Sequence, residues 1–256
     1  MTTLDATRPR PALGGFSTEF LALELRRLLR NRRIVSFALI LPPVFYLVIA
    51  LQGSNHTESY GNTRGYAMVT AIIFNSLFNA ANGGALVAVE RGLGWSRQLR
   101  LTPLRPAAYI AIKTIVAMVM PLAVMLSVSL LGALTGARLT AAAWVGSCLL
   151  AWACSLVFAA FGLFLGYLLP SESVMPLLGL LLAFLDFAGG LFFTMTGWVG
   201  VASKFVPTYG IASMARMPLG VESGGEIAAG AANIVVWGAF FIIGAMVLFR
   251  RDTARV

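Results

Sequence analysis

The sequence is poor in the side chains on which catalysis, metal binding and covalent cross-links depend. Its 256 residues include one His and two Cys, and 11% of them are charged. Cys148 and Cys154 lie in one apolar segment, where a helix would point them in different directions, with neither disulfide nor metal spacing. One His and scattered carboxylates do not supply the nucleophile, base and orienting group of a hydrolytic site. We therefore expect neither an enzyme nor a metal site.

A phosphate-binding loop is also missing. Nowhere does a glycine-rich run lead to Gly-Lys-Ser or Gly-Lys-Thr, the pattern that holds the phosphates of ATP. The net charge of +9 comes from Lys and Arg that flank apolar runs, without the aromatic platform of a nucleic-acid binder. We therefore expect no cofactor in this chain and no nucleic-acid partner. If the protein performs energy-dependent work, the energy must come from another protein or from a gradient.

Apolar residues are abundant, at 59% of the chain with a mean hydropathy of +0.84. A soluble domain of this composition would have too little polar surface to cover itself. A bilayer core about 30 Å thick needs about 20 apolar helical residues to cross it, and a β-barrel would need short alternating segments instead. The sequence thus predicts an all-α integral membrane protein with six transmembrane helices. The six runs are Ile34 to Gln52, Tyr66 to Val89, Ile110 to Leu134, Ala142 to Leu169, Val174 to Phe193 and Ala231 to Phe249.

An amphipathic helix is expected before the first run, from Ser17 to Arg33. Leu21, Leu25 and Leu28 recur at helical spacing, and arginines gather toward its end, where they match the helix dipole. Such a helix would lie on the anionic inner leaflet as an interfacial elbow. Alternatively, it is only a charged flank that orients the first span. Residues 1–33 are therefore predicted to be a cytosolic tail and elbow, ahead of a transmembrane domain at 34–249.

The basic residues also predict the orientation. With the amino terminus inside, all but four of the 19 Lys and Arg residues fall in or beside cytosolic segments, as the positive-inside rule requires. The four are Arg64, Arg138, Lys204 and Arg216. Both termini, including a short tail at 250–256, are then expected in the cytoplasm, with the protein multi-pass in the cell membrane. Residues 189–230 mix apolar pieces with Gly and Pro, which predicts a re-entrant external segment or else an ordinary surface loop with one interfacial helix.

Polar residues within the spans are costly and therefore informative. Asp186 is the one carboxylate deep in a predicted span; it would line a cavity or relay a proton, or else stay neutral or bond to a neighbouring helix. Three asparagines share one face of the second span, for helix-to-helix hydrogen bonds or for a polar path. Aromatic side chains nearby could hold an apolar ligand, or contact lipid and core. The substrate-path candidates are Asn75, Phe78, Asn79, Asn82, Asp186 and Phe187.

The charged passage between the second and third runs, at 90–109, predicts a short helix on the membrane surface that Pro103 and Pro106 close. Its leucines and Trp95 would rest on lipid or a partner while its arginines face water. Together with Glu90, the glycines at 92 and 94, Leu99, Thr102-Pro103, Tyr109 and Lys113, it resembles the cytosolic loop of ATP-binding-cassette type-2 transporter permeases. The elbow, the six spans, the turn at Pro170 to Ser173 and the external Pro207-Thr208-Tyr209 are also similar to that family.

The resemblance implies an exporter permease driven by a separate cytosolic ATPase that binds ATP and Mg²⁺, with a second, identical or related permease chain. The loop would be the coupling helix that docks on the ATPase; since each glycine costs a helix up to about 1 kcal/mol, it would begin only at Trp95. A hydrophobic or amphiphilic antibiotic or drug is the expected cargo, with a polysaccharide or lipid exporter, a proton-coupled carrier using Asp186, or a membrane scaffold as alternatives. The coupling residues would be Glu90, Arg91, Gly92, Leu93, Gly94, Trp95, Arg97, Gln98, Leu99, Leu101, Thr102 and Pro103.

Overall fold

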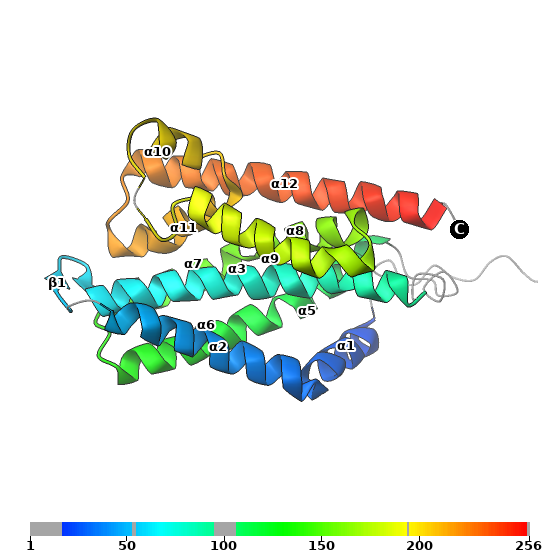
Figure 1. Cartoon of the computed structure of the whole chain (residues 1–256), viewed down its shortest axis with the longest axis horizontal. Helices are drawn as coiled ribbons and strands as arrows, with labels where there is room; N and C mark the ends of the chain where they lie inside the picture. Colours follow the sequence, from blue (N-terminus) through cyan, green and yellow to red (C-terminus); the bar gives the residue numbers. More distant parts are fainter. Residues whose placement is uncertain (1–16, 53–54, 95–105, 194, 255–256) are drawn as a thin grey trace, which may run out of the picture.

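A computed structural model describes residues 17–52, 55–94, 106–193 and 195–254 of the chain. Within these ranges the protein is a bundle of long helices that run side by side (Figure 1). The elbow α1 (Thr18–Arg30) and the final residues of α12 (Gly224–Ala254) lie at the same end of the bundle, which we call the α1 end. A short hairpin, β1 (Thr57–Glu58) and β2 (Gly61–Asn62), marks the opposite, hairpin end.

A helix, α1, forms within the stretch where the sequence predicted the elbow, and its position on the membrane surface stays a prediction. Ser17 caps the start of α1: its hydroxyl oxygen accepts a hydrogen bond from the Phe20 amide at 3.2 Å. This bond satisfies one of the first-turn N–H groups that have no partner within the helix. The next helix, α2 (Arg32–Leu51), continues through Pro42 and Pro43. Together, α1 and α2 form one candidate span bent by 62°. That α1 lies on the membrane surface and that α2 alone is the first of six spans both stay predictions.

Five further stretches are long and apolar enough to cross a membrane. They comprise α3 (Thr63–Gly92), α5 (Pro106–Ala117) with α6 (Val119–Leu134), α7 (Ala141–Cys154) with α8 (Leu156–Leu168), α9 (Ser171–Ala188) and α12. The third predicted span is interrupted at Met118, because Pro121 has no N–H to bond the carbonyl four residues back. The fourth is interrupted at Ser155, whose hydroxyl donates to the Trp152 carbonyl at 2.7 Å, a bond that competes with the helix ladder. The sequence did not predict that second break.

The centre of the bundle is α3, whose residues are buried along most of its length. It packs closely on α8 through small residues: a Cβ at Gly84 would overlap the Ala159 carbonyl, and one at Gly162 would overlap the Ala81 carbonyl. Glycine at both positions lets the two backbones approach, as in other helix pairs within membranes. All these helices together confirm the predicted fold class, an all-α integral membrane protein.

The hairpin end differs in detail from the prediction. The fifth span was expected to reach Phe193, but α9 ends at Ala188, and α12 begins at Gly224, well before the expected Ala231. Between them lie α10 (Gly197–Ser203), α11 (Pro207–Arg216) and a 3₁₀ turn, η2 (Met217–Leu219). Most of α11 is buried, and it packs against α7 and α12. Protein therefore covers this backbone, as a re-entrant segment requires.

Candidate functional site

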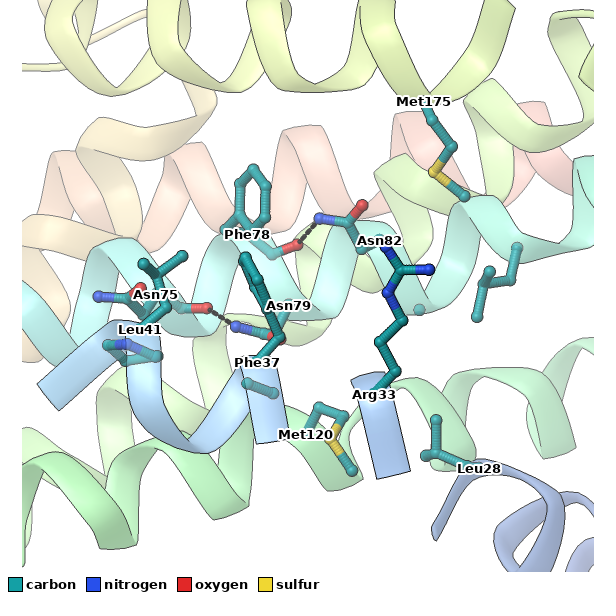
Figure 2. A pocket seen from close by; sticks show the side chains of 14 residues that line it. Leu28, Arg33, Phe37, Leu41, Asn75, Phe78, Asn79, Asn82, Met120 and Met175 are labelled. Atoms are coloured by element: carbon teal, nitrogen blue, oxygen red, sulfur yellow. Dashed lines mark hydrogen bonds between the residues drawn. The ribbon is translucent and has the colours of Figure 1, made fainter. Parts of the chain in front are cut away.

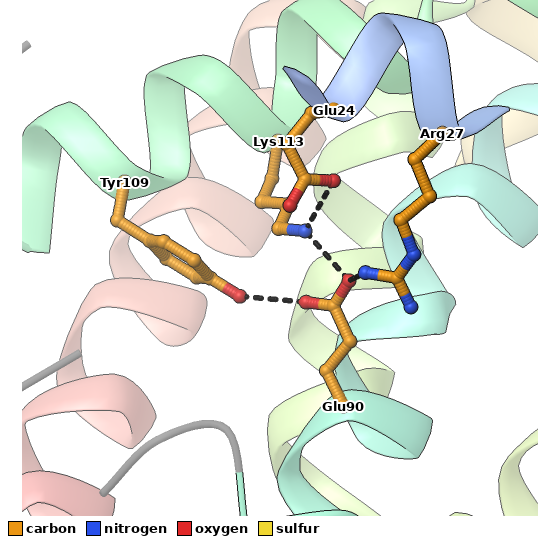
Figure 3. Close-up of polar contacts among 5 residues, drawn as sticks. All are labelled: Glu24, Arg27, Glu90, Tyr109 and Lys113. Atoms are coloured by element: carbon orange, nitrogen blue, oxygen red, sulfur yellow. Dashed lines mark hydrogen bonds and ion pairs between the residues drawn. The ribbon is translucent and has the colours of Figure 1, made fainter. Parts of the chain in front are cut away.

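Four charged side chains and a tyrosine meet at the α1 end, where α3 finishes (Figure 3). The Lys113 ammonium, on α5, lies 2.7 Å from Glu90 Oε1 and 2.9 Å from Glu24 Oε2, on α1. Tyr109 donates its hydroxyl to Glu90 Oε2 at 3.0 Å, and Arg27 Nη1 lies 3.2 Å from Glu90 Oε1. These five residues, which we call the ion cluster, join α1 to α3 and α5, the helices on either side of residues 95–105.

The cluster is balanced in charge and mostly buried. Two carboxylates face two cations, and the side chains of Lys113, Glu24 and Glu90 are 5%, 8% and 9% exposed. Arg27 is the exposed member, at 60%. Removing one partner of a buried ion pair leaves an uncompensated charge, which is far more costly than the net worth of the pair. The geometry therefore holds α1, α3 and α5 together at this point.

The position of Glu90 differs from the sequence-based expectation of a docking residue on the loop. Glu90 belongs to α3 and turns into the bundle, where its partners are in its own chain. Tyr109 and Lys113, which carried part of the family resemblance, are brought to the same place. Sequence analysis missed Glu24, although its position shares the buried face of α1 with Leu21 and Leu28. A carboxylate on the apolar face of an amphipathic helix was the available signal.

The next residue, Arg91, was expected to face water, but its guanidinium turns toward α8. It donates to the Gly166 carbonyl at 2.8 Å and the Tyr167 carbonyl at 3.1 Å. These carbonyls belong to the last turn of α8, where a cation is favourable. Gly92 ends α3 against Ser171, at the start of α9. The end of α3 is thus fixed to α8 and α9 as well as to the ion cluster.

Beyond α3, Leu93 is 76% exposed and Gly94 has a positive φ of 77°, a conformation that suits glycine. The helix therefore ends before Trp95. The remaining coupling residues that the sequence predicted lie outside the described residues. They are Trp95, Arg97, Gln98, Leu99, Leu101, Thr102 and Pro103.

A groove of about 450 Å³ runs along α3 between α2, α6 and α9 (Figure 2). The walls of this groove include four of the predicted substrate-path residues, the three asparagines and Phe78. The other wall residues are mainly apolar: Leu28, Phe37, Ala38, Leu41, Pro42, Gly83, Leu86, Met120 and Met175, with Arg33 at the α2 start. A second, smaller space of about 150 Å³ shares Leu28, Gly83 and Leu86 with it and is lined by four members of the ion cluster.

The asparagine side chains were expected first to make hydrogen bonds between helices, and the structure differs. Each amide donates to a carbonyl four residues earlier in α3: Asn75 to Ala71 at 2.9 Å, Asn79 to Asn75 at 2.8 Å and Asn82 to Phe78 at 2.7 Å. Such local bonds satisfy one N–H of each amide and leave its other polar atoms available to the groove. The asparagines line the groove, and their role as a polar path stays a prediction.

Asp186 and Phe187 lie apart from that groove. Asp186 is fully buried, and neither carboxylate oxygen has a hydrogen-bond partner among the described residues. The expected bond to a neighbouring helix is therefore not found there. Phe187 is 51% exposed and contacts Phe192 and Phe193. Within the described part of the chain, His, Cys, Asp and Glu form no group of three that could hold a metal ion.

A bundle of apolar helices with an amphipathic elbow, a re-entrant-like segment and charged contacts at one end defines a multi-pass α-helical membrane protein. The family model described as ABC-2 type transporter matches residues 19–218. The chain belongs to this ABC-2 type transporter family. The matched domain is the membrane-spanning part of such a transporter and not its ATPase. A search of curated proteins found no match.

Proposed function

We propose that this chain is the permease subunit of an ATP-binding-cassette exporter that moves a hydrophobic or amphiphilic antibiotic or drug out of the cell. A separate cytosolic ATPase binds ATP and Mg²⁺, and a second permease chain completes the path. Both termini and the α1 end face the cytoplasm. Family membership supports the permease role, and the apolar groove supports the cargo class over a polysaccharide, whose hydroxyl groups would need many more polar partners.

The observation that carries the coupling mechanism is the ion cluster. Glu90 precedes the predicted coupling loop, whereas Tyr109 and Lys113 follow it, and both Tyr109 and Lys113 donate to the Glu90 carboxylate. Both attachments of the loop are therefore tied together, and Glu24 ties the elbow to them. A push on the loop would move the ends of α3 and α5 as one unit instead of deforming a hinge.

Arg91 extends the same unit to α8. The loop would dock on the ATPase through Trp95 and its leucines, so that closure of two ATPases around ATP displaces these helix ends. Binding energy at the ATPase then becomes a difference in stability between inward-facing and outward-facing states, which is how a ligand shifts a conformational equilibrium.

Two variants test this coupling. Trp95→Ala removes the proposed anchor, and the ATPase that copurifies with the tagged wild-type chain should no longer do so. Glu90→Gln should keep that complex but uncouple it, with ATP hydrolysis continuing while export falls at least about tenfold, because the helix ends no longer move together. Glu172→Gln, which changes an exposed carboxylate in the first turn of α9 at the same end, is the matched control and should behave as wild type. Intact copurification with Trp95→Ala would show that the loop is not the docking element.

A second candidate rests on Asp186. Its carboxylate is buried without a partner in the described structure, and a buried acid of this kind can carry a proton in a secondary transporter. A proton-coupled carrier would transport cargo in vesicles that contain this chain alone and a pH gradient, whereas an ATP-driven permease would not.

A further inference from the structure

We propose that the groove along α3 binds one drug-sized amphiphile with a single anionic group, a carboxylate or phosphate, held between Arg33 and Asn82. This assignment deepens the proposed function, because only an exporter would make the bound molecule a cargo. The site itself needs no ATPase and is tested by binding alone.

Among the residues that line the groove, Arg33 is the cation, and the ion cluster at the same end does not use it. In the ion cluster, Glu24 and Glu90 offset Arg27 and Lys113. Arg33 lines the groove and has no carboxylate within ion-pair distance in the part of the chain that the structure describes. The groove end therefore carries one positive charge that its own walls do not neutralise.

The donors at this end converge on one place. Figure 2 shows the Arg33 side chain reaching from the start of α2 across the groove toward Asn82 on α3. Asn82 uses one N–H on the Phe78 carbonyl at 2.7 Å, which leaves its second N–H for a ligand. A guanidinium beside an amide N–H is a donor pair suited to an oxyanion, and charge-assisted hydrogen bonds of this type are the strong ones.

The rest of the groove fits an apolar body. Away from Arg33, its walls are Phe37 and Leu41 on α2, Phe78 on α3, and Met120 and Met175 from opposite sides (Figure 2). Methionine side chains adapt to ligands of varied shape. The volume of about 450 Å³ falls within the range of about 300 to 1,000 Å³ typical of drug-sized ligands. One acyl chain or small polycycle therefore fits better than a two-chain lipid.

The groove also adjoins the ion cluster, through which we propose that the ATPase acts. The smaller space that shares three of its wall residues is lined by Glu24, Arg27, Glu90 and Lys113. An anion at Arg33 would therefore lie next to the ion cluster that ties α1, α3 and α5 together. Occupancy of the groove can then influence the contacts through which the ATPase acts.

The test uses the full chain in discs of zwitterionic phosphatidylcholine, without ATPase. The probe is 11-(dansylamino)undecanoic acid, with its methyl ester as the uncharged counterpart, and energy transfer from protein Trp to dansyl reports the bound probe. Arg33→Gln should weaken saturable binding of the acid at least about tenfold, as expected for loss of a charge-assisted bond, and leave ester binding unchanged. Arg33→Lys should keep most of the acid affinity.

Two further variants define the site. Asn82→Asp preserves the shape but places a negative charge opposite Arg33, and should also abolish acid binding while sparing the ester. Arg32→Gln removes a neighbouring exposed arginine that does not line the groove, and should bind both probes as wild type does.

The proposal is overturned if Arg33→Gln and Arg32→Gln weaken acid binding equally, if acid and ester lose affinity together, or if no saturable binding occurs. Displacement of the acid by phosphatidylglycerol in the discs would likewise assign the groove to a bilayer lipid. Intact acid binding combined with absent ATP-driven export would instead contradict the proposed function and leave this site standing.

Discussion

The Lys113 ammonium lies 2.7 Å from Glu90 Oε1, so that an ion pair joins the end of α3 to α5. Both side chains are less than one-tenth exposed, and an ion pair held away from water depends on every one of its partners. Lys113 also contacts Glu24, so this lysine links α1 to both α3 and α5.

Lys113→Met is therefore expected to destabilise the protein by about 3 to 5 kcal/mol, because it leaves two buried carboxylates without their shared cation. A lower midpoint of thermal unfolding in detergent would show this. Lys204→Met, at an exposed lysine of the hairpin end, is the control and should change little. The double variant Glu90→Gln with Lys113→Met should be more stable than Lys113→Met alone, since one orphaned charge is removed. Equal stability of Lys113→Met and wild type would contradict the ion cluster.

Gly162→Ala is expected to destabilise the packing of α3 on α8, because the new Cβ would overlap the Ala81 carbonyl. The matched control is Gly179→Ala, also inside a helix but with nothing within 4 Å of the added Cβ. Alanine is better than glycine in a helix by about 1 kcal/mol, so Gly179→Ala should be neutral or stabilising. The unfolding temperature should thus fall for Gly162→Ala and stay equal or rise for Gly179→Ala, and an unchanged or raised unfolding temperature for Gly162→Ala would argue against close packing there.

Arg216→Met is expected to loosen the segment between α9 and α12. The Arg216 guanidinium is buried, donates to the Leu191 carbonyl at 2.6 Å and lies 5.0 Å from the centre of the Tyr66 ring. Loss of a hydrogen bond to a charged group costs about 1.5 to 3 kcal/mol. Hydrogen exchange should therefore rise in residues 189–220 but not in α3. Arg138→Met, at an exposed arginine of the same end, should leave the exchange unchanged, and unchanged exchange in Arg216→Met would refute this role.

Asp186→Leu is expected to stabilise the protein and to preserve ATP-driven export. The two Asp186 carboxylate oxygens are buried without partners among the described residues, and a buried polar group without a hydrogen bond costs about 1 to 3 kcal/mol. An apolar side chain of similar size removes that cost. The measurements are the unfolding temperature and export in vesicles that contain the ATPase. Complete loss of export with intact folding would favour the proton-coupled alternative.

The sequence by itself determined the class of protein. Hydropathy and run length are local properties, and burying about 20 apolar residues per span leaves little choice except helices that satisfy their own backbone groups. The approximate positions of α1 and α3 and the break before Pro121 follow from residues close together in the chain, whereas the early start of α12 at Gly224 does not. The ABC-2 resemblance likewise rested on short motifs, and the family match over residues 19–218 confirmed it.

Only the tertiary structure decided which polar residues meet. Glu24 and Lys113 are far apart in the chain, and their contact depends on how α1 packs against α5. Helical periodicity placed the asparagines on one face, but only the positions of α2 and α9 showed a groove there, with Arg33 at its end. Burial of Asp186 without a partner also depends on the neighbouring helices. Hydropathy determines whether a helix lies in the membrane, whereas the register and rotation of the packed helices determine which residues each buried side chain contacts.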